Sequence, residues 1–364
     1  MTQKTSSLLE ELPPVPEFSV QGVTIGDAHP PIVVAEIGIN HEGSLQTAID
    51  MADAALDAGV VFIKHQTHIP DAEMSEEAKT IKPGNADVSI YEVISRCTLS
   101  EDDERSLMQH VNERGGIFFS TPFSREAADR LAGWDIPLFK IGSGECNNYP
   151  LVEHIASFGK PVILSTGMNT IESVTPSVEI LRDAGVPFAL LHTTNLYPTP
   201  NHLIRLGGLT ALAEAFPDAV LGLSDHSTSN SACIGSVALG ARILERHFTD
   251  SPERPGPDIP CSMTPDEARH LITASHEVFE ASGGAKGPAD EEAVTIAFAF
   301  ASVVATRDLE PGDVLGPDNL WVKRPGGGDF GPTDLAGLYG RAVVAPAKAG
   351  FQLSAASVED GGLK

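Results

Sequence analysis

Short apolar runs recur eight times between residues 32 and 248, and each is followed by a polar cluster and then by a stretch with helical spacing. The runs are IVVAE (32–36), VVFIKHQT (60–67), IFFST (117–121), LFKIGSGE (138–145), PVILST (161–166), FALLHTTN (188–195), VLGLSD (220–225) and ARILERHF (241–248). Alternating strand and helix signals are typical of βα units around a parallel sheet. Eight such units predict an α/β fold with a closed (β/α)8 TIM barrel.

Two of the helical stretches carry clear end signals. SLQTAIDMADAALDAG has Ser44 as its N-cap and Gly59 as its stop, and TPDEARHLITASHEVFEAS has Pro265 in its first turn. Before the first barrel strand, FSVQGVTIG predicts a short hairpin that closes the bottom of the barrel.

After the last barrel helix the sequence changes character. SGGAKGPADEEA is rich in Gly, Pro and charge, as linkers are, and the remainder holds brief β runs, beginning with FAFASVVA, split by PG and GGG turns. We therefore expect an N-terminal extension and capping hairpin (1–30), the barrel (31–283), a linker (284–295) and a small β-rich domain (296–364). The extension through Pro16 is expected to be disordered.

Charge and composition exclude several classes of protein. With 24 basic and 50 acidic side chains the net charge is -26, which repels nucleic acid and anionic membranes. No run of eighteen apolar residues and no signal-peptide-like segment occurs, so we expect a soluble, cytoplasmic protein. The four cysteines have no CxxC spacing, which indicates reduced thiols.

Polar side chains stand at nearly every strand end, where the catalytic groups of a (β/α)8 barrel gather. In chain order they are Glu36, Lys64 with Gln66, Thr121, Lys140 with Ser143 and Glu145, Ser165, Asn195, Ser224 with Asp225 and His226, and His247. A barrel with a purely structural role would end its strands in small or turn-forming residues, so this pattern favours an enzyme.

His226 and His247 follow strands seven and eight. Neighbouring strands lie about 4.8 Å apart, so both imidazoles can reach one divalent metal ion, although either can equally be a structural histidine. Glu36 arrives from the adjacent first strand as a possible oxygen ligand or water-mediated partner.

Lys64 and Lys140 are isolated cations in an acidic protein. With Gln66, Thr121, Ser143, Ser165, Asn195 and Ser224 they form a predicted site for a small dianion or trianion, because ammonium groups fix phosphate and hydroxyl or amide groups complete its hydrogen bonds. The alternative is that the lysines extend from the barrel rim to solvent. Glu145 and Asp258 are acceptors suited to sugar hydroxyls, or simply solvated loop carboxylates.

Several long segments, in order, resemble the bacterial N-acetylneuraminate (sialic acid) synthases. They are AEIGINHEGS, IKHQTHI, PGNADVSIYE, STPFSREAADRL, FKIGSGECNNYPL, GKPVILSTGMN, NLYPTP, GLSDHS, ERHFTD, RPGPD and NLWVKRPGGGDF. The C-terminal part is similar to the antifreeze-like (SAF) domain that this family carries.

The resemblance implies a metal-dependent condensation of phosphoenolpyruvate with N-acetylmannosamine over Mn2+, or over Mg2+ or Co2+. It makes His226 and His247 the metal ligands, and it assigns Lys64, Gln66, Thr121, Lys140, Ser143, Ser165, Asn195 and Ser224 to phosphoenolpyruvate. Glu36, Glu145, Tyr197 and Asp258 would serve the sugar or the activated water. It further implies a domain-swapped homodimer in which Arg324 reaches the N-acetyl group across the dimer.

Alternatives to a neuraminate synthase are a legionaminate-type synthase acting on a 2,4-diacetamido hexose, a Schiff-base aldolase using Lys140 or Lys64, and a non-catalytic sugar-binding protein. FAFASVVA replaces an arginine-containing opening common in the wider superfamily, which favours the neuraminate branch. No added basic cluster is present to receive a 6-phosphorylated sugar, so free N-acetylmannosamine is the expected acceptor.

Overall fold

A computed structural model describes residues 16–82 and 87–360, which form two compact units that divide between Gly283 and Gly284. The disorder expected for the N-terminal extension concerns residues 1–15, which lie outside the described ranges. In the part of the chain that the structure describes, every helix is too short or too polar to cross a bilayer.

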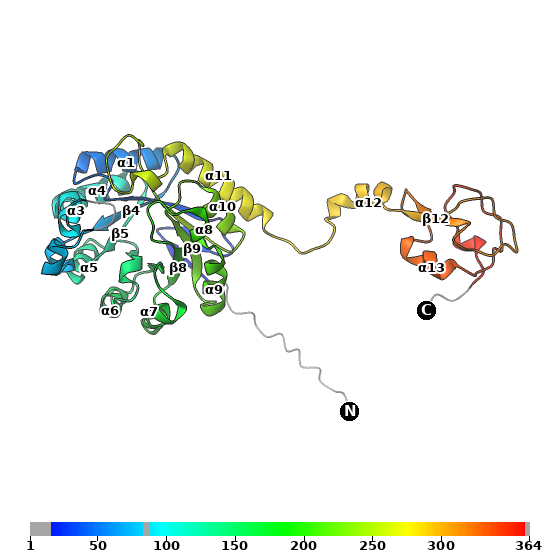
Figure 1. Ribbon diagram of the computed structural model, residues 1–364, viewed down its shortest axis with the longest axis horizontal. Helices are drawn as coiled ribbons and strands as arrows, with labels where there is room; N and C mark the ends of the chain where they lie inside the picture. Colours follow the sequence, from blue (N-terminus) through cyan, green and yellow to red (C-terminus); the bar gives the residue numbers. More distant parts are fainter. Residues whose placement is uncertain (1–15, 83–86, 361–364) are drawn as a thin grey trace, which may run out of the picture. The chain divides into compact units, whose positions relative to one another are not determined.

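Eight parallel strands of the first unit close into a barrel, so the predicted TIM-barrel fold is confirmed (Figure 1). Their order around the barrel is β10-β3-β4-β5-β6-β7-β8-β9. The strands are β3 (Ile32–Gly38), β4 (Phe62–Thr67), β5 (Ile117–Pro122), β6 (Phe139–Ile141), β7 (Val162–Ser165), β8 (Phe188–Thr193), β9 (Val220–Asp225) and β10 (Ile243–His247).

Several strands are shorter than the runs that predicted them, and the difference is largest for LFKIGSGE. We expected LFKIGSGE to be extended through Glu145, but β6 ends at Ile141 and Ser143–Glu145 form a 3-10 helix, η2. The GSG sequence explains the difference, because small residues without β-branching release the chain from the sheet. Glu145 therefore lies on a turn beyond the strand.

An antiparallel hairpin of β1 (Glu17–Val20) and β2 (Val23–Gly26) precedes the barrel, as expected. Phe18, Val20 and Ile25 are buried in one cluster with inward-facing strand residues such as Phe62 and Ile243. The hairpin therefore closes the amino-terminal end of the barrel with apolar side chains.

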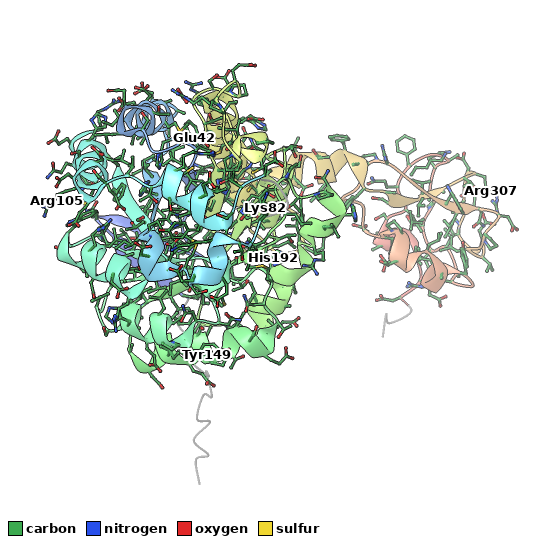
Figure 2. The ribbon with its side chains drawn as sticks, turned by 60° about the vertical axis from the view of Figure 1, so that its left-hand side comes forward. Glu42, Lys82, Arg105, Tyr149, His192 and Arg307 are labelled. Atoms are coloured by element: carbon green, nitrogen blue, oxygen red, sulfur yellow. The ribbon has the colours of Figure 1, made fainter. Side chains whose placement is uncertain are left out.

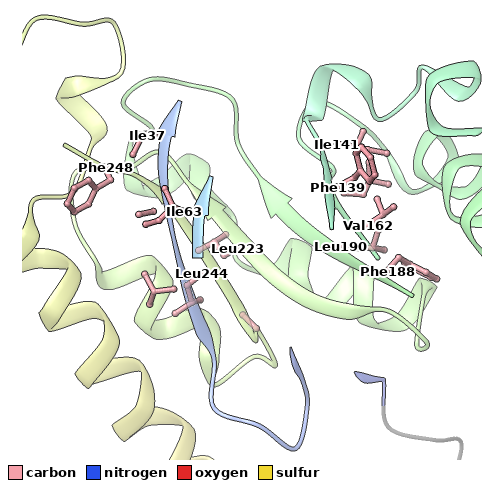
Figure 3. Close-up of a cluster of buried hydrophobic side chains, with 14 of the residues drawn as sticks. Ile37, Ile63, Phe139, Ile141, Val162, Phe188, Leu190, Leu223, Leu244 and Phe248 are labelled. Carbon is pink, nitrogen blue, oxygen red and sulfur yellow. The ribbon is translucent and has the colours of Figure 1, made fainter. Parts of the chain in front are cut away.

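Alternation along each strand divides the side chains into an inner and an outer set. In β10, Ile243 belongs to the inner apolar cluster, whereas Leu244 packs in the larger cluster between strands and helices, part of which is shown in Figure 3. The same alternation sends Glu245 and His247 inward. The barrel interior is thus apolar at its amino-terminal end and becomes polar toward the carboxyl ends of the strands.

Helices surround the barrel, and Figure 2 shows Arg105 of α4 and Tyr149 of α6 on this outer ring. The α-helices are α1 (Leu45–Asp57), α2 (Pro70–Glu73), α3 (Ile90–Cys97), α4 (Glu101–Glu113), α5 (Arg125–Gly133), α6 (Tyr149–Ala156), α7 (Ile171–Asp183), α8 (Asn201–Ile204), α9 (Gly207–Ala215), α10 (Ser231–Val237) and α11 (Pro265–Ala281). The 3-10 helices η1 (Glu76–Lys79) and η3 (Ile259–Cys261) lie in loops.

The predicted helix ends are present in α1 and α11. Ser44 accepts a hydrogen bond from the Thr47 backbone N–H, and Gly59 has a φ of +94°, which a glycine adopts without strain. Thr264 caps α11 in a capping box with Glu267.

The second unit has a small antiparallel sheet of β11 (Ser302–Ala305) and β12 (Leu320–Lys323) around its own apolar core, which includes Val303, Leu320 and Phe330. Its other elements are η4 (Asp290–Glu292), α12 (Ala293–Ala299), η5 (Pro332–Asp334), α13 (Leu335–Leu338) and η6 (Ala355–Ser357). Of the segment FAFASVVA, Ser302–Ala305 form the strand β11, whereas α12 continues to Ala299. Three alanines in AVTIAFA favour the helix.

Candidate active site

A cavity of about 520 Å³, measured to its open mouth, lies at the carboxyl ends of the barrel strands. Its lining contains most of the predicted site residues: Glu36, Lys64, Gln66, Thr121, Lys140, Ser143, Ser165, Asn195, Tyr197, Ser224, His226 and His247. Phe123, Gly142, Gly144, Thr193 and Glu245 complete it. Residues from all eight strands or their following loops thus meet in one place.

Two buried lysines form the floor of this cavity. Lys140 Nζ donates to Ser165 Oγ at 2.7 Å, and Lys64 Nζ donates to Thr121 Oγ1 at 3.3 Å. Lys64 also forms an ion pair with Glu36, and both ammonium groups face Glu245 Oε1, at 3.8 Å from Lys64 and 3.6 Å from Lys140. The cavity therefore offers two cations with hydroxyl groups beside them.

The two lysines differ in their pKa. Burial lowers the pKa of Lys140 to about 8, since it outweighs the attraction of Glu245. Burial also acts on Lys64, but Glu245 and Glu36 outweigh it and raise the Lys64 pKa above its usual value. Lys64 is therefore a fixed cation, whereas Lys140 can lose its proton near neutral pH.

Glu245 is a site residue that the sequence prediction missed. Its carboxylate accepts from Ser224 Oγ at 3.1 Å, and although burial alone would raise its pKa, Lys140 and Lys64 hold it below the usual value. The signal was present in the sequence: Glu245 stands two residues before His247 in β10, so alternation places both side chains inside the barrel.

His226 and His247 lie together at the cavity mouth, with ring centroids 5.4 Å apart. Burial lowers the pKa of each ring to about 4, so both are neutral at pH 7. His226 Nδ1 donates to the Thr194 carbonyl at 2.8 Å, which leaves its Nε2 lone pair free. His247 Nδ1 is buried without a hydrogen-bond partner.

These features fit a pair of metal ligands, because neutral imidazoles with free lone pairs ligate divalent ions and a second hydrogen bond orients one ring. No group of three or more His, Cys, Asp and Glu side chains suited to a metal ion occurs within residues 16–82 and 87–360.

Asp258 and Tyr197 lie beside the histidines. Asp258 Oδ2 is 3.6 Å from His247 Nδ1, and burial raises the Asp258 pKa to about 6 despite the opposing charge of Lys64. The Tyr197 ring stacks on His226 with centroids 4.2 Å apart. Both residues can thus meet a ligand that approaches the imidazoles.

Besides Asp258, which lies next to His247 but does not line the cavity, two predicted site residues are not in it. Glu145 lines a separate depression with Glu73 and Glu126, and it accepts from Asn148 Nδ2 at 2.5 Å. Arg324 belongs to the second unit, where it follows β12 and is exposed. Neither side chain contributes to the barrel cavity.

Comparisons with known proteins agree with the fold and show the family of the chain. The model of the NeuB family matches residues 51–287, and that of the SAF domain matches residues 300–359. The chain is 33% identical to the N,N'-diacetyllegionaminic acid synthase of Campylobacter jejuni, over 82% of this chain and 91% of that protein. It is 29% identical to the human N-acetylneuraminate-9-phosphate synthase, over 89% of this chain and 91% of that protein.

Among solved structures, the N-acetylneuraminic acid (sialic acid) synthetase of Leptospira borgpetersenii, crystallised with citrate, superimposes with a TM-score of 0.71. It is 27% identical in sequence, and the match covers 78% of this chain and 95% of that one. The similarity thus spans the barrel and most of the length of each of these proteins.

Proposed function

Because the chain belongs to the NeuB family of sugar acid synthases, we propose that it condenses phosphoenolpyruvate with N-acetylmannosamine and water to give N-acetylneuraminate and phosphate. The observation that carries the proposal is the cavity with two buried lysines at its floor and two neutral imidazoles at its mouth. This arrangement provides one place for a phosphorylated acid and an adjacent place for a carbonyl compound.

Phosphoenolpyruvate would bind at the lysine end. Lys64 and Lys140 would neutralise its phosphate and carboxylate, and the hydroxyl groups of Thr121 and Ser165 already lie within hydrogen-bond distance of the two ammonium groups. Ser143, Asn195, Ser224 and Gln66 line the same cavity and would complete the hydrogen-bond shell.

The acceptor sugar would bind at the histidine end in its open-chain form. A divalent ion such as Mn2+ held by His226 and His247 would act as a Lewis acid on the aldehyde carbonyl. Tyr197 and Asp258 stand beside the two rings and would hold sugar hydroxyl groups.

The carbon–carbon bond would form between C3 of phosphoenolpyruvate and the aldehyde carbon. Water would then add at C2, and the resulting tetrahedral intermediate would lose phosphate to leave the keto acid. Glu36, which lines the cavity and contacts Lys64 and Gln66, would orient this water.

The second unit would act on the barrel of a partner chain. We propose a domain-swapped homodimer in the cytoplasm in which Arg324 reaches the N-acetyl group of the sugar bound by the other subunit. Glu145, on the turn after β6, would meet the sugar only outside the cavity described above.

A second candidate acceptor is a 2,4-diacetamido hexose, as used by a legionaminate-type synthase. The observation that favours it is the 33% identity to a diacetyllegionaminic acid synthase, against 29% to a neuraminate-9-phosphate synthase. The two candidates share the phosphoenolpyruvate chemistry and differ only in the acceptor.

Metal removal tests the proposed chemistry. Turnover should stop in excess chelator and return with Mn2+, and His226→Ala should stay inactive with Mn2+ while keeping the thermal unfolding profile of the wild type. Full activity in chelator, together with trapping of pyruvate on Lys140 by borohydride, would instead indicate a Schiff-base aldolase.

A further inference from the structure

A chain of hydrogen bonds runs from the cavity to two buried residues behind it. Gln66 Nε2 donates to Glu36 Oε1 at 2.8 Å, and Gln66 Oε1 lies 3.1 Å from His68 Nε2. His68 Nδ1 in turn lies 3.0 Å from each carboxylate oxygen of Glu73. The side chains of His68 and Glu73 are only 4% and 6% exposed, and neither residue lines the cavity.

Each partner in this chain fixes the orientation of the next. The Glu73 carboxylate only accepts hydrogen bonds, so His68 Nδ1 donates to it. On the other side of the imidazole ring, His68 Nε2 faces the amide oxygen of Gln66 and donates a hydrogen bond to it. A flipped amide would place the Gln66 oxygen 2.8 Å from Glu36 Oε1, where two acceptors would meet without a proton between them.

An aromatic contact holds the same imidazole in place. The His68 ring stacks on Phe123, with centroids 4.4 Å apart and an interplanar angle of 11°. Phe123 lines the cavity. His68 therefore supports the cavity twice, through the Gln66 amide and through the Phe123 ring.

We propose that His68 and Glu73 are positioning residues for the reaction: they hold the Gln66 amide with its NH2 group toward Glu36, and so fix the carboxylate between Gln66 and Lys64. The proposal rests on the proposed function, in which Glu36 orients the attacking water. Without His68 and Glu73, the Gln66 amide is held only by its hydrogen bond to Glu36, so it can rotate away and the carboxylate then loses one of its two fixed partners.

The main test is the double variant His68→Phe/Glu73→Leu. It keeps an aromatic ring against Phe123 and leaves no buried carboxylate unpaired. We expect kcat to fall about 10- to 100-fold, as when outer hydrogen-bond partners of active groups are removed. The KM for phosphoenolpyruvate should change much less than kcat, because Gln66 is only one of the polar groups proposed to bind it and the contact between Lys140 and Ser165 is untouched. Unchanged kcat would overturn the proposal.

A second experiment separates positioning from a general structural role. In a Gln66→Ala background the double variant should cause no further loss of kcat, because the group through which His68 and Glu73 act is gone. If the double variant lowers kcat equally in the wild type and in Gln66→Ala, His68 and Glu73 do not act through Gln66. Asp53→Asn is the matched control: it removes the carboxylate that contacts His110 at 2.7 Å, between α1 and α4, and should leave kcat unchanged.

A third measurement does not depend on turnover. In 15N-histidine spectra, with the His68 signal assigned by its loss in His68→Phe, both ring nitrogens should show hydrogen-bonded protons in the wild type, and the Nδ1 proton signal should shift in Glu73→Gln, where a neutral amide replaces the charged acceptor. A wild-type ring with a single proton would contradict the proposed orientation. If the wild type turns over no sugar, the proposed function fails, whereas the spectrum still decides whether the hydrogen-bond chain exists.

Discussion

Glu245 has a central place among the individual residues, because it is the carboxylate that faces both lysines of the cavity floor. Two ammonium groups buried side by side repel each other, and this repulsion is offset while Glu245 is ionised. A phosphate group that binds here would take over part of that role. The carboxylate therefore stabilises the free site, and in the proposed complex it would share the lysines with phosphoenolpyruvate.

Glu245→Gln should lower the free energy of unfolding by roughly 3 kcal/mol, the usual size of the effect when one partner of a buried ion pair is removed. Urea unfolding of the two proteins measures it. Inorganic phosphate should restore more stability to the variant than to the wild type, because the anion replaces the lost charge. The exposed Glu179→Gln on α7 is the control, and an equal phosphate effect on all three proteins would contradict this account.

Phosphoenolpyruvate binding should weaken as the pH rises through about 8. Burial lowers the pKa of Lys140 to about 8, so the ammonium form that attracts the anion is present below this pH and is lost above it. Plots of log kcat/KM for phosphoenolpyruvate between pH 7 and 9.5 should bend downward near 8. Lys140→Arg stays charged and should show no bend; the same bend in this variant would assign it to another group.

At the level of strands and loops, the sequence predicts the barrel well because both faces of each parallel strand are buried, which leaves continuous apolar runs. The polar strand ends were predictable for the same reason, since a polar residue at the end of such a run stands out. Glu245 was not predicted because it lies inside strand β10, whereas the prediction considered only the residues at strand ends, such as His247. Glu145 was expected at the end of a strand that continues through GSG, but the chain leaves the sheet at Ile141 and Glu145 lies on the following 3-10 helix.

The loop after β7 offers a test of how closely the elements pack around the cavity. A Cβ at Gly167 would lie 1.9 Å from Asn195 Oδ1 and 2.7 Å from Ser143 Oγ. Gly167→Ala should therefore displace both side chains from the cavity and raise the KM for phosphoenolpyruvate about 10-fold, the equivalent of one lost hydrogen bond to a charged group. Gly133→Ala, where the new Cβ meets nothing within 4 Å, should behave as the wild type.

At the level of the whole molecule, the chain consists of two units with separate cores, and the second unit presents apolar side chains to solvent. Phe298 and Phe300, at the end of α12, are 58% and 61% exposed. The sequence indicated the two units through the Gly- and Pro-rich linker, but not α12, whose short AVTIAFA run satisfies both strand and helix patterns. Local propensity alone cannot decide such a segment.

The swapped-dimer proposal predicts complementation between two inactive variants. In this arrangement His226→Ala removes a metal ligand from the barrel site, and Arg324→Ala removes the side chain that reaches the sugar bound by the other subunit. A dimer with one chain of each kind should therefore contain one intact site, built from the barrel of the Arg324→Ala chain and the second unit of the His226→Ala chain. Random mixing should restore roughly a quarter of wild-type activity. Mixtures no more active than the separate proteins, with subunit exchange verified by mass spectrometry, would contradict the arrangement.

The most direct test of the central claim is phosphate release from phosphoenolpyruvate in the presence of Mn2+, with four parallel additions. These are N-acetylmannosamine, its 6-phosphate, a 2,4-diacetamido hexose and no sugar. The account predicts release with free N-acetylmannosamine, little with its 6-phosphate and none without sugar. Preference for the diacetamido sugar would contradict the proposed acceptor and support a legionaminate-type synthase, and no release with any sugar would contradict the proposed reaction itself.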